Sequence, residues 1–142
     1  MSNLKLEHAR RIVAAALVKG RELGLKPLTV AVLDSGGHLI ALERENGSST
    51  LRPQIAVAKA SGALALGVSS RKIGEMTLER PVFMASLANL NPAGVLPAAG
   101  GVIVVDDEGT AIGAVGITGT TSDEDEHCAR AGIAAAGLKA QP

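Results

Sequence analysis

The sequence has almost no aromatic residues: of its 142 residues, none is Trp or Tyr and one is Phe. Proteins that bind single-stranded nucleic acid stack the bases on aromatic side chains, so this mode of binding is excluded. A surface that binds the phosphate backbone needs an excess of positive charge, whereas 14 Lys and Arg residues balance 14 Asp and Glu residues here. The sequence therefore predicts no nucleic-acid partner.

Long hydrophobic runs and paired cysteines are missing as well. The apolar patch over residues 12–18 is far shorter than the roughly 20 residues that cross a bilayer, so we expect no membrane segment. Cys128, the lone cysteine, cannot form an internal disulfide, which suits a reducing, cytoplasmic location. The three histidines show none of the spacings of a zinc site, so no metal is expected.

Small residues take the place of the missing ones, with 24 alanines and 17 glycines. The high apolar content and the absence of net charge exclude an intrinsically disordered chain. A chain of this length without a linker-like stretch predicts one domain over residues 1–142. Its composition favours helices and subunits that pack closely together.

Hydrophobic periodicity predicts the order of the elements. Apolar residues at spacings of three and four indicate a helix over residues 4–23, whose apolar face is smooth because it consists largely of alanine and Gly20. Further helices are expected at 51–66, from Ser69 or Ser70 to 76, at 81–90, and at about 120–138, where Thr121 with Glu124 or Ser122 with Asp125 can cap the helix. One short extra strand is expected within 94–101.

Two segments look alike and read as β-hairpins. Residues 30–42 and 102–114 each contain four apolar residues, then Asp-x-x-Gly, then a second strand, and the two aspartates are 72 positions apart. An aspartate that opens such a turn bonds to the backbone that follows it, and the glycine takes the left-handed position. Hairpins imply an antiparallel sheet with helices packed against it, which is an α+β fold.

A glycine-rich segment at residues 112–119 resembles a phosphate-binding loop at first sight. Its glycines are three apart, which matches neither the dinucleotide nor the P-loop spacing, and four carboxylates at 123–126 open the next helix. Those carboxylates would repel a phosphate at the helix N-terminus. The glycines instead predict that a helix or a second subunit lies close to this strand.

Two side chains stand out as candidates for chemistry. His38 directly follows the first hairpin turn, where an imidazole can act as a ligand or an acid–base group, although a hydrogen-bonded surface histidine fits the pattern equally. Lys59 lies among small apolar residues, which favours an ammonium group that reaches solvent over one that faces a carboxylate in a pocket. The Asp125–Glu126 pair is explained by helix capping.

Several segments, in order, resemble one family. They are Leu-Lys-Leu-Glu-His-Ala at 4–9, Val-Leu-Asp-Ser-Gly-Gly-His-Leu at 32–39, Ala-Lys-Ala at 58–60, the glycine-rich stretches 94–101 and 112–119, and the pairs at 125–126 and 131–132. Together they are similar to the GlcG/HbpS family, which includes haem-binding HbpS proteins and the C-terminal domain of PduO-type proteins. The resemblance implies a profilin-like α/β/α fold with about five antiparallel strands, and a homo-oligomer.

The resemblance also implies binding of a small-molecule ligand, with haem as the first expectation, and haem sensing or degradation as its use. His38, His8 and Met84 are then the candidate cofactor-binding residues. The scarcity of aromatic side chains argues against haem, because haem pockets usually contain them.

Two alternatives remain open at the level of the sequence. One is an enzyme that acts on a small anionic catabolite, such as a tautomerase, hydrolase or dehalogenase of a hydroxymuconate-like acid. In it Lys59 or Arg52 would hold the anion and His38 would transfer the proton. The other is a non-catalytic accessory protein of a glycolate or propanediol operon.

Overall fold

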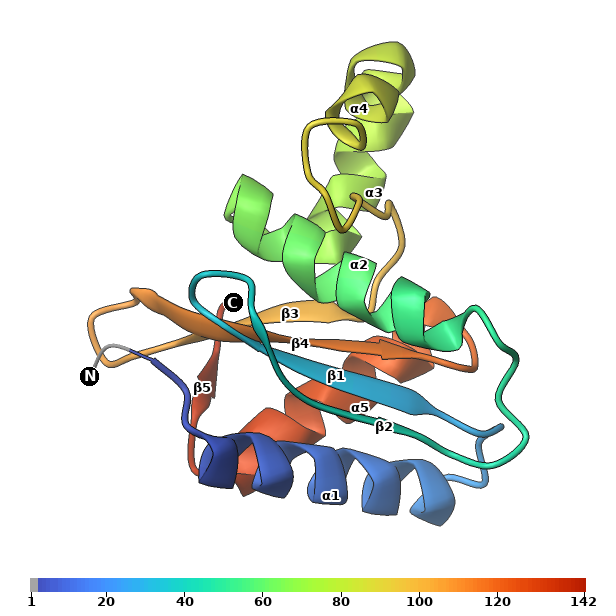
Figure 1. The fold of residues 1–142 in the computed structure, drawn as a ribbon, viewed down its shortest axis with the longest axis vertical. Helices are drawn as coiled ribbons and strands as arrows, with labels where there is room; N and C mark the ends of the chain where they lie inside the picture. Colours follow the sequence, from blue (N-terminus) through green and yellow to red (C-terminus); the bar gives the residue numbers. More distant parts are fainter. Residues whose placement is uncertain (1–2) are drawn as a thin grey trace.

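The structure, a computed structural model, describes residues 3–142 as a sheet between two layers of helices (Figure 1). The helices are α1 (Leu6–Glu22), α2 (Arg52–Leu66), α3 (Ser70–Glu79), α4 (Pro81–Leu87) and α5 (Ser122–Ala135). The strands are β1 (Thr29–Asp34), β2 (Leu39–Arg44), β3 (Gly101–Val105), β4 (Ala111–Thr118) and β5 (Lys139–Ala140). In the described part of the chain, no helix is long and apolar enough to cross a membrane.

The five strands form one sheet in the order β2-β1-β4-β3-β5, and every neighbouring pair is antiparallel. This confirms the expected α+β fold. The prediction of an extra strand within 94–101 is wrong, because that stretch is irregular up to the start of β3 and the fifth strand follows α5 at residues 139–140. Pro97 cannot donate to a ladder, whereas the C-terminal segment can, and the amide of Gln141 donates to the carbonyl of Ile103.

Helices α1 and α5 cover one face of the sheet and α2 covers the other, while α3 and α4 project away from the body (Figure 1). The smooth face of α1 packs within the chain. A Cβ added at Gly132 of α5 would lie 2.7 Å from the carbonyl oxygen of Ile12, so the two helices touch through their backbones. The alanine face predicted from the sequence is therefore packed against α5 and the sheet.

Helix α2 lies directly on β3 and β4. A Cβ added at Gly116 would lie 1.9 Å from the carbonyl oxygen of Ala56, and one added at Gly101 would lie 2.3 Å from that of Lys59. No other residue fits at such distances. The prediction that the glycine-rich segment brings a helix close to the strand is confirmed.

Both hairpin turns have the same construction. Oδ1 of Asp34 accepts the amides of Gly36 and His38, and Oδ1 of Asp106 accepts the amides two and four residues further on. Gly37 and Gly109 have φ angles of 82° and 83°, which a residue with a Cβ rarely adopts. The two similar segments predicted from the sequence therefore form turns with the same pattern of hydrogen bonds.

The helix caps follow the local sequence. Thr121 caps α5 by accepting the amide of Glu124, as predicted. Of the two candidate caps of α3, Ser69 accepts the amide of Lys72. Ser70 instead accepts the amide of Gly101 and so attaches α3 to the start of β3.

Candidate functional site

The first hairpin turn presents His38 to solvent, with 81% of its side chain exposed. Its Nδ1 lies 3.2 Å from Oδ1 of Asp34, the oxygen that also accepts two backbone amides. Desolvation opposes the charge on this carboxyl, but the amides of His38 and Gly36 and the imidazole outweigh it and lower the pKa of Asp34. When the charged carboxylate of Asp34 accepts a hydrogen bond from Nδ1, Nε2 is the ring nitrogen left for another partner.

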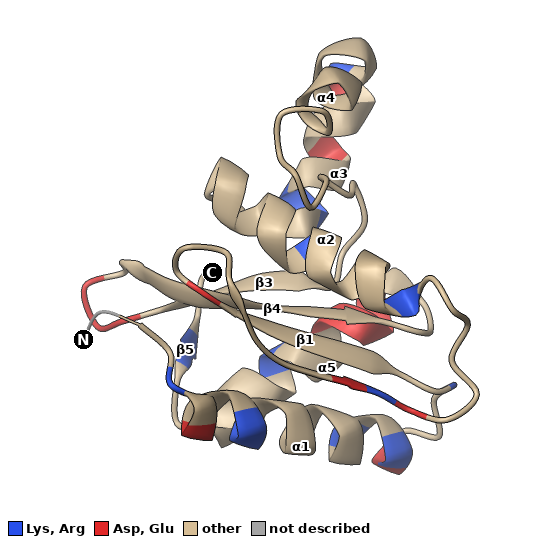
Figure 2. Ribbon diagram, in the orientation of Figure 1, with Lys and Arg blue, Asp and Glu red and all other residues tan. Residues whose placement is uncertain are grey.

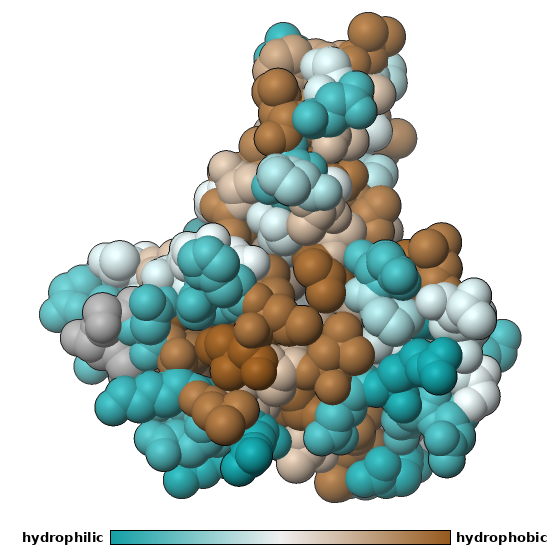
Figure 3. All heavy atoms as spheres, in the orientation of Figure 1, coloured by the Kyte–Doolittle hydropathy of each residue, from teal (hydrophilic) through white to brown (hydrophobic). Residues whose placement is uncertain are grey.

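Two hollows lie along the face of α2 that is turned toward β2, and we call them together the α2 groove. The larger, of about 410 Å³, is lined by Leu39, Leu42, Pro53, Gln54, Val57, Pro92 and Ala93. The smaller, of about 160 Å³, is lined by Ser35, Gly36, Gly37, Ser61, Leu64, Ala65 and Asn91. Figure 3 shows hydrophobic residues gathered over β2 beneath α2.

An irregularity in β2 turns two leucines toward this groove. The register between β1 and β2 shifts so that Ile40 has no partner. Ile40 and Ala41 pack toward the core beneath the sheet, while Leu39 and Leu42 border the groove above it. A bulge thus re-aims side chains that strict alternation would place on opposite faces.

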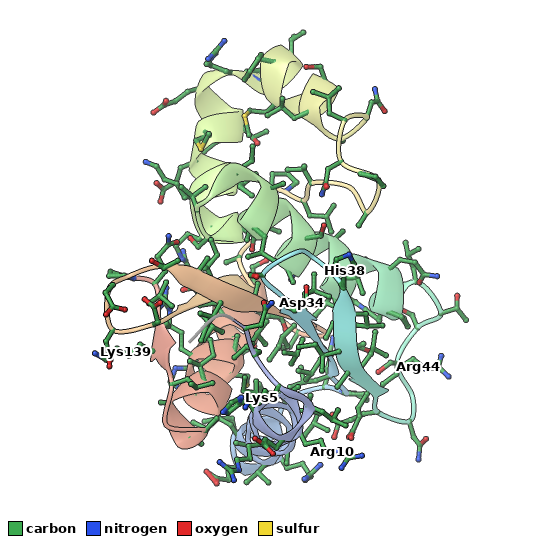
Figure 4. The ribbon with its side chains drawn as sticks, turned by 60° about the vertical axis from the view of Figure 1, so that its left-hand side comes forward. Lys5, Arg10, Asp34, His38, Arg44 and Lys139 are labelled. Atoms are coloured by element: carbon green, nitrogen blue, oxygen red, sulfur yellow. The ribbon has the colours of Figure 1, made fainter. Side chains whose placement is uncertain are left out.

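In the sequence, His38 lies between residues that line the two hollows. The turn residues before it line the smaller hollow, and Leu39, directly after it, lines the larger one. In Figure 4, His38 and Asp34 lie together at the turn, and Arg44 lies at the opposite end of β2. The turn therefore presents an exposed, oriented imidazole next in the sequence to residues of both hollows, although His38 itself lines neither of them.

The other two candidate haem ligands lie elsewhere. Met84 is buried in α4 and borders an apolar hollow of about 310 Å³ between α3 and α4. His8 lies in the first turn of α1, where its Nδ1 accepts the amide of Lys5. The structure does not bring either side chain to the α2 groove.

Lys59 is almost fully buried, with 4% of its side chain exposed, so the expectation that its ammonium reaches solvent is wrong. Its Nζ lies 3.2 Å from Oδ2 of Asp125 and donates to the carbonyl of Ile117 at 2.9 Å. Lys59 belongs to α2 and Asp125 to α5, on opposite faces of the sheet. The ammonium passes the backbone at Gly100, where a Cβ would lie 2.8 Å from Nζ.

Burial controls the electrostatics of this pair. Loss of solvent lowers the pKa of Lys59 and raises that of Asp125, and the attraction between them offsets only part of each shift. Oδ1 of Asp125 also accepts the amide of Thr120. This ion pair therefore connects the two helix layers, and Lys59 is not a free cation that could bind a substrate.

The residues proposed for an anionic substrate do not converge. Arg52 lies near Lys59 on α2, and its Nη1 donates to Oγ1 of Thr118 at 2.7 Å. Both cations are thus at the end of β4, whereas His38 is at the other end of β1. Along the β1–β4 ladder, Asp34 is four residue steps from the pair at Ile117 and five from the pair at Thr118, which corresponds to about 13 to 17 Å.

Some residues of these sites carry no sequence signal. Asp125 looks like one more acid in a helix first turn, although it is the partner of Lys59. The groove residues Pro92 and Val57 become neighbours only because the chain returns past α2 after α4. The small apolar residues around Lys59 mark the position, but they fit an ammonium in solvent as well as one beside a carboxylate.

The chain was compared with known proteins. The profile of a family described as haem degrading protein HbpS-like matches residues 4–134. A solved PduOC–heme complex has a TM-score of 0.86 at 22% identity and covers 99% of both chains. Protein ORFY of Klebsiella pneumoniae has a TM-score of 0.86 at 24% identity, over 96% of this chain and 92% of its own. HbpS has a TM-score of 0.81 at 27% identity, over 94% and 90%. No curated protein sequence matches the chain.

These comparisons agree with the features described above. The structural matches to PduOC and ORFY show the same fold: a five-stranded antiparallel sheet between helix layers. The profile match spans nearly the whole chain, from two residues before α1 to within α5. The chain therefore belongs to the HbpS-like family.

Proposed function

We propose that this protein binds haem in the α2 groove and that Nε2 of His38 would be a ligand of the iron. The observation that carries the proposal is the hydrogen bond between Nδ1 of His38 and Asp34 beside an apolar groove. A histidine that binds a metal commonly donates its second ring nitrogen to a carboxylate, which fixes the ring and raises its basicity. The family, and a relative solved with heme, support the same ligand.

The groove supplies apolar contact without aromatic side chains. Leucine, valine and proline side chains line its larger hollow. A porphyrin face needs apolar surface more than it needs aromatic rings, so the missing aromatics do not exclude the ligand. The haem would supply an iron that can take a nitrogen ligand, and this chain would supply the oriented ring of His38 and the apolar wall.

Replacement of His38 by alanine tests whether its ring is a ligand of the iron. Titration of the wild-type protein with haemin is expected to give a saturable shift of the Soret band. In His38→Ala the shifted band should be lost and the affinity reduced at least about tenfold, because the iron loses its nitrogen ligand. His127→Ala removes an exposed histidine of α5 and serves as the control. An unchanged Soret spectrum in His38→Ala would contradict the assignment.

Introduction of a charge tests the groove itself. Val57→Glu places a carboxylate on its wall and should weaken haemin binding about tenfold or more, because the charge loses water when the porphyrin covers it. Leu51→Glu makes the same change at a position that is 60% exposed and outside the groove, so its affinity should match the wild type. Equal affinities for the two variants would place the haem elsewhere.

We also propose that the protein is a homo-oligomer. The projecting part of the chain from α3 to the loop after α4 exposes large apolar side chains, with Leu78 86% exposed, Val82 85% exposed and Leu90 78% exposed in the isolated chain. Exposed large apolar side chains are typical of surfaces that contact another protein.

The free thiol of Cys128 is compatible with a reducing compartment, and we propose that the protein is cytoplasmic.

A further inference from the structure

The outward face of α1 has a pattern that neither the core nor the α2 groove uses. Arg11, Ala15, Val18 and Glu22 follow one another at spacings of four, three and four, so they form one stripe along the helix. Val18 is 45% exposed, although it is a large apolar side chain. The stripe borders a hollow of about 610 Å³ whose other wall is formed by the small residues Ala131 and Ala135 of α5.

The stripe begins and ends with opposite charges. Arg11 is basic, Glu22 is acidic, and neither has an ion-pair partner among residues 3–142. In Figure 2, α1 carries acidic residues near both of its ends and basic residues between them. A surface with opposite charges at its two ends and small residues at its centre is complementary to itself when rotated by 180°.

We propose that a second copy of this chain packs on α1, with the two α1 helices antiparallel about a two-fold axis between Ala15 and Val18. In this arrangement Arg11 faces the partner's Glu22, and Glu22 faces the partner's Arg11. Val18 faces the partner's Ala15 and enters the hollow beside α5. Alanines at the crossing point allow the helix axes to approach to about 8 Å.

The charges on α1 select this register over its neighbours. A shift by one helical turn that places Arg11 opposite Val18 would set Glu7 against Glu22 and Arg10 against Lys19. Both of those contacts are repulsive. A parallel pair would oppose Arg11 to itself. Of these three arrangements, only the antiparallel register through Ala15 and Val18 pairs Arg11 with Glu22 at both ends, and like charges at an interface disfavour the other two.

This surface is independent of the proposed haem site. Helices α1 and α5 cover one face of the sheet, and the α2 groove lies on the other (Figure 1). The contact between the α1 helices of two subunits would be one interface of the proposed homo-oligomer. It depends on the proposal of an oligomer and not on the proposal of haem binding. Haemin binding should therefore be the same in α1 variants and in the wild type.

A charge swap tests the interface through sedimentation equilibrium of the intact protein. Arg11→Glu and Glu22→Arg should each raise the dissociation constant of the α1 contact at least about tenfold, because each creates two repulsive contacts per pair of subunits. The double variant Arg11→Glu with Glu22→Arg should return to within about threefold of the wild type. Arg10→Glu makes the same charge change one residue away, about 100° around the helix, and is the control.

Each outcome decides the proposal. Weaker association of both single variants, with recovery in the double variant, supports the antiparallel contact. Unchanged association of the single variants, or a double variant as weak as they are, overturns it while leaving the homo-oligomer standing. A wild-type protein that stays monomeric at about 100 µM overturns both the α1 contact and the homo-oligomer. Circular dichroism checks that every variant keeps its helix content.

Discussion

Gly116→Ala is expected to destabilise the protein by about 3 kcal/mol, because the added methyl group has no space. Its Cβ would lie 1.9 Å from the carbonyl oxygen of Ala56, which belongs to the backbone of α2. Backbone cannot rotate away as a side chain can, so α2 must move off the sheet and lose contacts along β3 and β4. In thermal unfolding the midpoint should fall by about 10 °C.

Gly20→Ala is the matched control for this substitution. An added Cβ there would lie 2.7 Å from Cδ1 of Leu28, which is the far end of a flexible side chain. Gly20 lies within α1, where alanine is favoured over glycine by about 1 kcal/mol. We expect its stability to stay within about 1 kcal/mol of the wild type. If both variants unfold at the same temperature, the close approach of α2 to β4 is wrong.

Asp125→Asn is expected to destabilise the protein by about 3–5 kcal/mol, because it leaves the ammonium of Lys59 buried without its counter-charge. Asparagine keeps the oxygen that accepts the amide of Thr120, so the start of α5 retains its hydrogen bond. The double variant Lys59→Met with Asp125→Asn removes the stranded charge. It should recover at least about 2 kcal/mol in chemical denaturation. A double variant no more stable than Asp125→Asn would show that the ion pair does not connect the helices.

The pH dependence of the stability of Asp125→Asn is a second test of the ion pair between Lys59 and Asp125. Burial already lowers the pKa of Lys59, and removal of the carboxylate, which raises it, lowers it further. Folded Asp125→Asn then binds the proton of Lys59 more weakly than the unfolded chain, so its free energy of unfolding increases as the pH rises. The defect should be largest near neutral pH and should shrink at alkaline pH. The double variant lacks Lys59 and should show no such slope.

The two hairpins show how much local sequence can determine. An aspartate three residues before a glycine predicted both turns, and the structure repeats the same hydrogen bonds from Asp34 and Asp106. Thr121 as the cap of α5 was predictable for the same reason. Each of these structures is stabilised by bonds between residues at most four positions apart, so the information is contained in a short segment.

The candidate site was predictable only in part. His38 was singled out because it follows a turn, and the turn also places Asp34 beside its ring. The apolar groove next to it was not predicted, because its walls come from β2, α2 and the chain after α4. The bulge at Ile40, which turns Leu39 and Leu42 toward that groove, arises from strand pairing and has no signature in β2 alone.

The sequence by itself determined the α+β fold class, the family, the hairpins and the absence of aromatic platforms. The tertiary structure alone decided what Lys59 does. Its flanking alanines are compatible with an ammonium in solvent or with one beside a carboxylate. Its partner Asp125 is 66 positions away, in the first turn of α5, where helix capping already accounts for the acidic residues. Short-range bonds depend on neighbouring residues and can be inferred from them, whereas a buried charge is stabilised by whichever distant group the packing of α2 and α5 brings to it.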